Sequence, residues 1–443
     1  MDSMTTDVCI LGGGSGGLVV ASAAAQFGVQ VVLIENRKMG GECLNYGCVP
    51  SKSLISVAHL GYTLNQAKCY GFSIPSFSID TIKVHQYIQS VIQSIAKHDS
   101  VERFESLGVK VLQGKAEFTD PNVLVFDGKT KVKSKYFVIA TGSSPIVPAI
   151  EGLTNVPFLT NENIFDLKEK VEHLLVLGGG PVGCELAQAY RLLGSKVTLL
   201  ARSHLLTKDD VEWVYELKKV FVEQGIKIYE DLAFESVSQH SKTIEITFKQ
   251  HDERQLVQGS HVLVATGRIP NVKNLNLRQA NIAYDKSGIN VNSNLRTTNK
   301  RIFAIGDVIK SFKFTHVASY HAGLVIQNIL FKRHKKVNYH TLPWITYTTP
   351  QLAHIGLTEN QALKLKGQKR IIVKKFNDND HAQTEGETIG GIKLMTTKGG
   401  KVLGVSILGH QVDNFVKLVE LSDGRKYFLG ESCRINHTLS HKK

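Results

Sequence analysis

Ile10-Leu11-Gly12-Gly13-Gly14-Ser15-Gly16-Gly17 is the stretch of this 443-residue chain that most constrains its fold. It follows the apolar run Val8 to Leu11 and precedes a predicted helix over Leu18 to Phe27. A second apolar run, Val29 to Ile34, ends in Glu35. This succession of strand, glycine-rich turn, helix and strand with an acid at its tip predicts a βαβ unit that binds a dinucleotide.

Each of these positions has a physical task in such a unit. Gly12 permits the tight turn, and Gly14 lets the backbone approach a pyrophosphate. Gly17 allows close packing of helix on strand, and Glu35 can accept the ribose hydroxyls.

A second copy of the pattern lies further along the chain. Leu174 to Leu177 is a predicted strand, and Gly178-Gly179-Gly180-Pro181-Val182-Gly183 follows it. A predicted helix over Cys184 to Leu193 then leads into a strand over Lys196 to Leu200. Two such units predict two bound dinucleotides.

The second copy lacks an acid at the tip of its second strand. Ala201 stands at that position and Arg202 follows it. A cation there suits the 2′-phosphate of NADPH, so NADPH is favoured over NADH. The alternative is that Arg202 is a solvated surface charge.

Two cysteines follow the first unit in the run Gly40-Gly41-Glu42-Cys43-Leu44-Asn45-Tyr46-Gly47-Cys48-Val49-Pro50-Ser51-Lys52. Cys48 stands where a helix is predicted to begin, and a helix N-terminus favours the thiolate. A disulfide beside a redox cofactor can accept two electrons and pass them on by thiol–disulfide exchange. A structural disulfide and two free thiols are the alternatives.

Taken together, these motifs resemble the class I pyridine nucleotide–disulfide oxidoreductases, the flavoenzyme group of dihydrolipoamide dehydrogenase, glutathione reductase and mercuric reductase. The resemblance extends from residue 7 to about Gly409. Val197 to Ser203 is most similar to the mercuric reductase branch, which uses NADPH. The further matching stretches are Ala140 to Pro145, Ala265 to Asn271, Ile302 to Asp307, and Phe314 to Ala318.

The resemblance implies an enzyme that passes electrons from NADPH through FAD to a Cys43–Cys48 disulfide. The final acceptor would be another disulfide or a soft metal ion such as Hg²⁺. Cys48 would be the thiol on the flavin side, and Cys43 the thiol that meets the substrate. Lys52 would reach the flavin and pair with Glu185.

The resemblance also implies a set of cofactor contacts, and no resident metal. The contacts are Gly12, Gly14, Ser15, Gly17, Glu35, Asn36, Gly41, Glu42, Lys52, Ala116, Thr141, Gly142, Gly178, Gly180, Gly183, Arg202, Gly267, Arg268, Gly306 and Asp307.

The predicted fold class is α/β, with two Rossmann-like dinucleotide-binding domains and a C-terminal α+β dimerisation domain. Residues 1–150 and 271–335 would form the FAD-binding domain, with one long helix over Asp80 to Leu107. Residues 151–270 would bind NAD(P), and residues 336–443 would form the interface of a homodimer.

The C-terminus departs from the family pattern, which ends in a His-Pro-Thr-x-Ser-Glu-like run. Here the chain ends Ile435-Asn436-His437-Thr438-Leu439-Ser440-His441-Lys442-Lys443. Alignment puts Asn436 in the place of the family's histidine, and His437, one residue away, is the candidate acid–base residue if the backbone is shifted. Without a histidine as general acid–base, exchange with a neutral dithiol should be slower by about 10²–10⁴-fold. Three functions stay open: the reductase above, a dihydrolipoyl dehydrogenase, and a flavoprotein with impaired output that acts as a diaphorase, an NADPH oxidase or by interaction.

Composition places further bounds on the protein. The six cysteines are too few for a disulfide framework in a chain of 443 residues, so a reducing cytoplasm is expected. No apolar run is long enough to span a membrane. The net charge of +14 can attract nucleic acid, but no nucleic-acid-binding module surrounds the basic run Lys332 to Lys336. We therefore expect anionic cofactors and a small acceptor as ligands.

Overall fold

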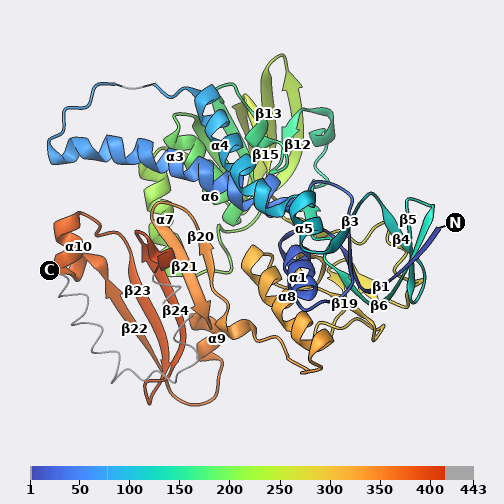
Figure 1. Ribbon diagram of the computed structural model, residues 1–443. Helices are drawn as coiled ribbons and strands as arrows, with labels where there is room; N and C mark the ends of the chain where they lie inside the picture. Colours follow the sequence, from blue (N-terminus) through green and yellow to red (C-terminus); the bar gives the residue numbers. More distant parts are fainter. Residues whose placement is uncertain (1, 77, 415–443) are drawn as a thin grey trace.

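The computed structural model describes residues 2–76 and 78–414. Figure 1 shows two sheet-and-helix bodies at the top and right and a separate sheet near the C-terminus at the lower left. The long helix α3, Cys48–Gln66, extends away from the centre of the molecule along the upper body.

The first body is built on a seven-stranded sheet in the order β3-β2-β1-β6-β5-β4, with β19 paired to β6. Its central strands are parallel and buried on both faces, which explains their continuous apolar sequences. Helices α1 and α8 pack against each other beside this sheet (Figure 1). The bounds are β1 Asp2–Leu11, α1 Ser15–Gln26, β2 Val31–Glu35, β3 Val109–Gln113, β4 Ala116–Asp120, β5 Val123–Phe126, β6 Thr130–Ile139, β19 Ile302–Ala304 and α8 Thr315–Leu330.

The second body repeats this plan with a parallel five-stranded sheet in the order β11-β10-β9-β15-β8. A three-stranded antiparallel sheet, β12-β13-β14, packs beside it. The bounds are β8 Phe158–Leu159, β9 His173–Leu177, α6 Pro181–Leu192, β10 Lys196–Leu200, α7 Val211–Glu223, β11 Ile226–Tyr229, β12 Ala233–His240, β13 Thr243–Gln250, β14 Glu253–Gly259 and β15 His261–Val264.

The predicted long helix over Asp80 to Leu107 is wrong. The structure has α4, Thr81–Ala96, then a 3₁₀ turn, η2, Lys97–Asp99, and α5, Val101–Ser106. Ser100 is extended, with ψ 157°, and its hydroxyl accepts a hydrogen bond from the Arg103 amide at 3.2 Å. Serine therefore caps a new helix here instead of continuing the old one.

The C-terminal sheet is antiparallel, in the order β20-β21-β24-β23-β22. Its bounds are β20 Trp344–Thr346, β21 Gln351–Gly356, β22 Lys369–Lys375, β23 Gly391–Thr397 and β24 Val402–Gly409, with helices α9 Glu359–Leu363 and α10 Asp380–Glu385. The short elements are α2 Gly41–Asn45, η1 Ala67–Tyr70, β7 Ser143–Pro145, η3 Leu153–Asn155, η4 Ile164–Asp166, β16 Arg268–Pro270, β17 Tyr284–Asp285, β18 Gly288–Ile289, η5 Gly306–Val308, η6 Tyr339–Thr341 and η7 Phe376–Asp378.

The chain leaves the first body after β7 and returns to it through β16, which pairs with β7. β19 then joins β6 in the first sheet. We retain the domain boundaries predicted at 150, 270 and 335 as a proposal.

Candidate active site

The two glycine-rich turns have the same backbone geometry. Gly12 and Gly178 have φ of +108° and +122°, a region that side chains rarely enter. A Cβ at either position would overlap a carbonyl oxygen, that of Ala140 or of Ala265. A Cβ at Gly17 would likewise overlap the Gly12 carbonyl, and Gly183 has the same relation to Gly178. Both turns therefore require glycine for close approach of strand and helix.

The first turn opens onto a cavity of about 810 Å³, which lies within the usual size range of small-molecule sites. Glu35 is buried at the tip of β2, and its carboxylate accepts the amides of Gly13 at 2.5 Å and Arg37 at 2.6 Å. A large cavity bordered by a glycine turn fits the dinucleotide FAD. The predicted contacts that line it are Gly12, Gly14, Glu35, Asn36, Gly41, Glu42, Ala116, Thr141 and Gly142.

The two cysteines lie together at the start of α3, which begins at Cys48 as predicted. Both are free thiols and the two side chains are hydrogen-bonded to each other. The Cys48 sulfur also lies 3.2 Å from the Thr315 hydroxyl at the start of α8. Cys43 is half-buried, whereas Cys48 is exposed.

The two thiols have opposite protonation tendencies. The hydrogen bond from Cys43 lowers the pKa of Cys48 to about 6, and the Thr315 hydroxyl and the charge of Lys52 act in the same direction. The pKa of Cys43 is raised because Cys43 donates that bond and is desolvated. Cys48 is therefore the thiolate of the pair at neutral pH.

Lys52 lies one turn beyond Cys48 on α3 and forms an ion pair with Glu185 of α6, with 2.6 Å between Nζ and Oε2. The Glu185 side chain is 6% exposed and also accepts the Tyr347 amide at 2.8 Å. The Lys52 ammonium lies 4.5 Å from the centroid of the Tyr347 ring. The first body, the second body and the C-terminal sheet thus meet beside Cys48.

A second polar network lies next to Cys43. The Glu42 carboxylate contacts the Arg268 guanidinium and accepts the Asn161 amide at 2.9 Å. Arg268 also donates to the Ser143 hydroxyl, which donates to Asp307, both at 2.7 Å. Burial raises the pKa of Glu42 to about 7 despite the nearby guanidinium.

Gly306 and Asp307 form the 3₁₀ turn η5 beside α8. The Gly306 amide donates to Nδ1 of His321 at 3.2 Å, and burial lowers the pKa of that imidazole to about 4. His321 therefore acts as a neutral acceptor that fixes this turn.

At the tip of the second fold, Ala201 is buried and Arg202 is exposed. Glu230, which directly follows β11, places a carboxylate at this edge. The sequence pattern did not indicate this acid. Its carboxylate is engaged by the Leu205 amide at 2.7 Å and by Lys218 at 2.5 Å. Arg202 is therefore an exposed cation, and Glu230 is already engaged by other residues of this edge.

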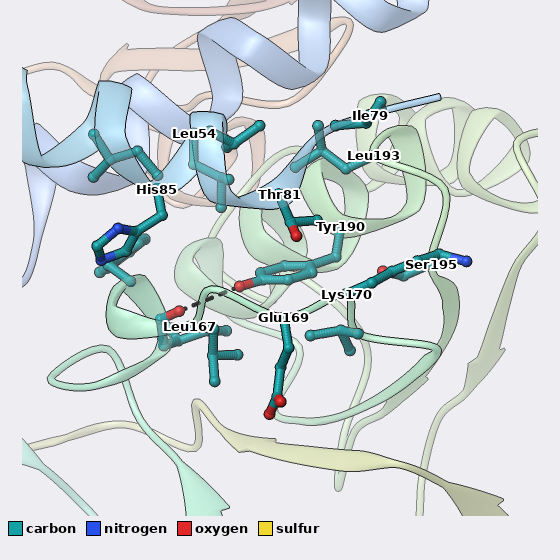
Figure 2. A pocket seen from close by; sticks show the side chains of 15 residues that line it. Leu54, Ile79, Thr81, His85, Leu167, Glu169, Lys170, Tyr190, Leu193 and Ser195 are labelled. Carbon is teal, nitrogen blue, oxygen red and sulfur yellow. Dashed lines mark hydrogen bonds between the residues drawn. The ribbon is translucent and has the colours of Figure 1, made fainter. Parts of the chain in front are cut away.

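A small cavity of about 40 Å³ lies between α3, α4 and α6 (Figure 2). Leu54, His85, Leu167 and Tyr190 are among its lining residues, and the Tyr190 hydroxyl donates to the Ile164 carbonyl at 3.3 Å. This space holds a few water molecules at most and is too small for a dinucleotide.

The described residues contain no group of three or more His, Cys, Asp or Glu side chains arranged to hold a metal ion. Among residues 2–76 and 78–414, no helix has the length and apolar character needed to cross a membrane. The predicted acid–base candidate His437 lies outside the described residues.

Several site residues were not singled out from the sequence. Thr315 contacts Cys48 from 267 positions away. Tyr347 borders the Lys52–Glu185 pair, and Asn161 and Ser143 complete the network around Glu42 and Arg268. The family-matching stretches Phe314 to Ala318 and Ala140 to Pro145 could have indicated Thr315 and Ser143, but nothing local marks Tyr347 or Asn161.

The comparisons with known proteins agree with this geometry. The sequence model of the pyridine nucleotide-disulphide oxidoreductase family matches residues 6–322, and that of the family's dimerisation domain matches residues 342–422. The matches confirm the predicted family, and with it the α/β fold that combines cofactor-binding and dimerisation domains.

Individual relatives come from two enzyme classes. The chain is 31% identical to a mercuric reductase of Staphylococcus aureus over 419 residues, covering 94% of this chain and 76% of that protein. It is 30% identical to a dihydrolipoyl dehydrogenase of Bacillus subtilis over 416 residues, covering 92% and 90%. The solved Cu(II) complex of the flavoprotein disulfide reductase RclA from Escherichia coli matches with a TM-score of 0.84 at 25% identity, covering 95% and 93%.

Proposed function

The chain belongs to the pyridine nucleotide-disulphide oxidoreductase family, and we propose that it reduces a soft metal ion such as Hg²⁺ with electrons from NADPH. It is an FAD-dependent oxidoreductase that uses a reduced pyridine nucleotide. The proposal concerns the choice of coenzyme, the roles of the site residues and the acceptor.

The residues that we propose for electron input lie at the second glycine turn, just after β10 and on α3. Gly178, Gly180 and Gly183 would admit the coenzyme pyrophosphate, and the exposed Arg202 would bind the 2′-phosphate. FAD, when bound, relays two electrons from the nicotinamide to the sulfur pair. Lys52 would stabilise negative charge near the flavin, while Glu185 and Tyr347 hold its ammonium in place.

The output proposal rests chiefly on the sulfur pair at the start of α3. Cys48 is a thiolate at neutral pH and is exposed, and Cys43 lies within hydrogen-bonding distance of it. Thiolates are preferred ligands of soft metal ions, which bind sulfur directly and need no proton on a leaving group. Overall, NADPH and Hg²⁺ would give NADP⁺, H⁺ and Hg⁰, a balanced two-electron reaction.

A disulfide acceptor makes a further demand, because the leaving sulfur must gain a proton. Within the described residues, the hydrogen-bonding partners of the two sulfurs are hydroxyl groups and each other, and none is a histidine. In the C-terminal sequence, Asn436 also replaces the histidine of the family pattern, so we place lipoamide and glutathione disulfide second. The Cu(II) complex of the E. coli reductase supports a metal ion as the first choice.

A substrate screen tests the proposal. Purified enzyme with NADPH is assayed with a dye, Hg²⁺, Cu²⁺, lipoamide and glutathione disulfide. We expect strong dye reduction, measurable reduction of a metal ion and poor reduction of both disulfides. Turnover of lipoamide at roughly tens per second or more would instead identify a dihydrolipoyl dehydrogenase. Dye reduction alone would identify a diaphorase.

The matched dimerisation domain supports a homodimer. Sedimentation equilibrium checks this, with twice the 48.9 kDa mass of the chain as the expected result. A monomer at micromolar concentration would contradict it.

A further inference from the structure

The strand β20 begins with Trp344, one of two tryptophans in the chain. Its indole N–H donates to the Asp209 carboxylate at 2.8 Å. Asp209 belongs to the segment Ala201–Asp210 that follows β10, which we name the coenzyme loop because it carries Arg202. Trp344 therefore joins the C-terminal sheet to the part of the second fold that would meet the coenzyme ribose.

Two other residues of the coenzyme loop, Leu206 and Asp210, are also held by hydrogen bonds or ion pairs. The Leu206 amide donates to the carbonyl of Gly179 in the glycine turn at 2.9 Å. Asp210 caps α7 and pairs with the buried Lys393 of β23 at 2.8 Å. Asp209 lies between these two anchors in the sequence. Its bond to Trp344 is therefore a third attachment of the segment from Leu206 to Asp210.

The indole ring also makes a second set of contacts. It stacks on Phe312, with centroids 5.6 Å apart and planes 24° apart, and on His354 at 4.3 Å. Phe312 in turn stacks on Phe314, the N-cap residue of α8. The next residue, Thr315, holds the Cys48 sulfur at 3.2 Å.

We propose that Trp344 is a positioning residue that ties the coenzyme loop to the support of the Cys48 thiolate. This inference rests on the proposed function, in which NADPH binds the second fold. The indole N–H positions the coenzyme loop through Asp209, and the ring positions the start of α8 through Phe312. The N–H contact can be removed while an aromatic ring is kept, which distinguishes the two roles of Trp344 from each other.

Trp344→Phe keeps an aromatic ring against Phe312 but removes the N–H donor. Hydrogen bonds to charged groups are the stronger kind, so we expect the KM for NADPH in dye reduction to rise about tenfold. The kcat and the rate of Cys48 alkylation should stay within about twofold of the wild type. Trp344→Leu also removes the stack, so it should slow Cys48 alkylation several-fold in addition to raising KM.

Two comparisons complete the design. Trp213→Phe is the matched control, because Trp213 donates its N–H to the Ser406 carbonyl at 3.2 Å and has no bond to Asp209. Its KM should remain near the wild-type value, with FAD content and melting temperature confirming that each variant is folded. Asp209→Ala should raise KM as Trp344→Phe does, and the double variant should add nothing, because both changes remove one interaction.

An unchanged KM in Trp344→Phe would overturn the proposal, as would independent effects in the double variant. An unchanged alkylation rate in Trp344→Leu would refute the link to Cys48. These outcomes are distinct from failure of the proposed function. In that case, NADPH would not reduce the flavin of the wild-type enzyme, whatever residue stands at position 344.

Discussion

The charge of Lys52 should set the reactivity of Cys48, and replacing it tests the site directly. Lys52→Met removes the cation that helps to lower the Cys48 pKa and leaves the Glu185 carboxylate, whose negative charge raises it. A nearby opposite charge typically shifts a pKa by about 1–3 units. Lys52 is 35% exposed, so solvent screening places the expected rise at about one unit.

The size of the effect on alkylation follows from that shift. With a pKa near 6, about nine-tenths of Cys48 is thiolate at pH 7, and with a pKa near 7 about half is. The expected loss of rate is therefore about twofold at pH 7 and about fivefold at pH 6. Iodoacetamide labelling of the reduced enzyme, read by mass spectrometry of the Cys48 peptide, measures this without interference from other thiols.

Two variants serve as controls for this measurement. Lys52→Arg keeps the positive charge, so the pH midpoint of Cys48 alkylation in this variant should stay near that of the wild type. Adding Glu185→Gln to Lys52→Met removes the carboxylate as well. The pH midpoint of Cys48 alkylation should then return part of the way toward the wild-type value. An unchanged midpoint in Lys52→Met, or an equal shift in Lys52→Arg, would refute the reasoning.

The remaining predictions concern the pH response, the coenzyme and FAD. In wild-type enzyme, alkylation of Cys48 should rise with pH and have its midpoint near pH 6, because the thiolate forms above its pKa; a midpoint above 8 would contradict the assigned hydrogen bonding. Arg202→Glu should lower the NADPH-to-NADH ratio of kcat/KM by about tenfold or more, and a wild-type preference for NADH would show that the phosphate-site assignment is wrong. Gly12→Ala should yield protein without bound FAD, since φ is +108° and the new methyl overlaps Ala140, whereas Gly323→Ala in α8 has free space and should keep FAD; equal flavin content would contradict this.

The repeated local patterns could be predicted from the sequence. Glycine spacing and apolar runs depend on a few neighbouring residues, so both dinucleotide folds were placed correctly, and β10 has the predicted bounds Lys196–Leu200. The start of α3 at Cys48 was also correct. The break at Ser100 was missed, because the apolar pattern on either side of it is helical and a single capping hydroxyl redirects the chain.

Contacts between distant segments could not be predicted in the same way. Glu42 and Arg268 lie 226 positions apart, and Trp344 and Asp209 lie 135 apart. No local pattern links such pairs, since only the packing of the domains brings them together. The family resemblance supplied the pairing of Lys52 with Glu185, but it gave no indication of Trp344 as a neighbour of the site.

The central claim is that electrons from NADPH reach the Cys43–Cys48 pair. Anaerobic stopped-flow reduction of oxidised enzyme by NADPH, followed by quenching and counting of thiols, tests it most directly. We expect two new thiols per chain, mapped by mass spectrometry to Cys43 and Cys48, and none in Cys43→Ser, which should keep its FAD. Reduction of the flavin without any gain of thiols at these two positions would contradict the account.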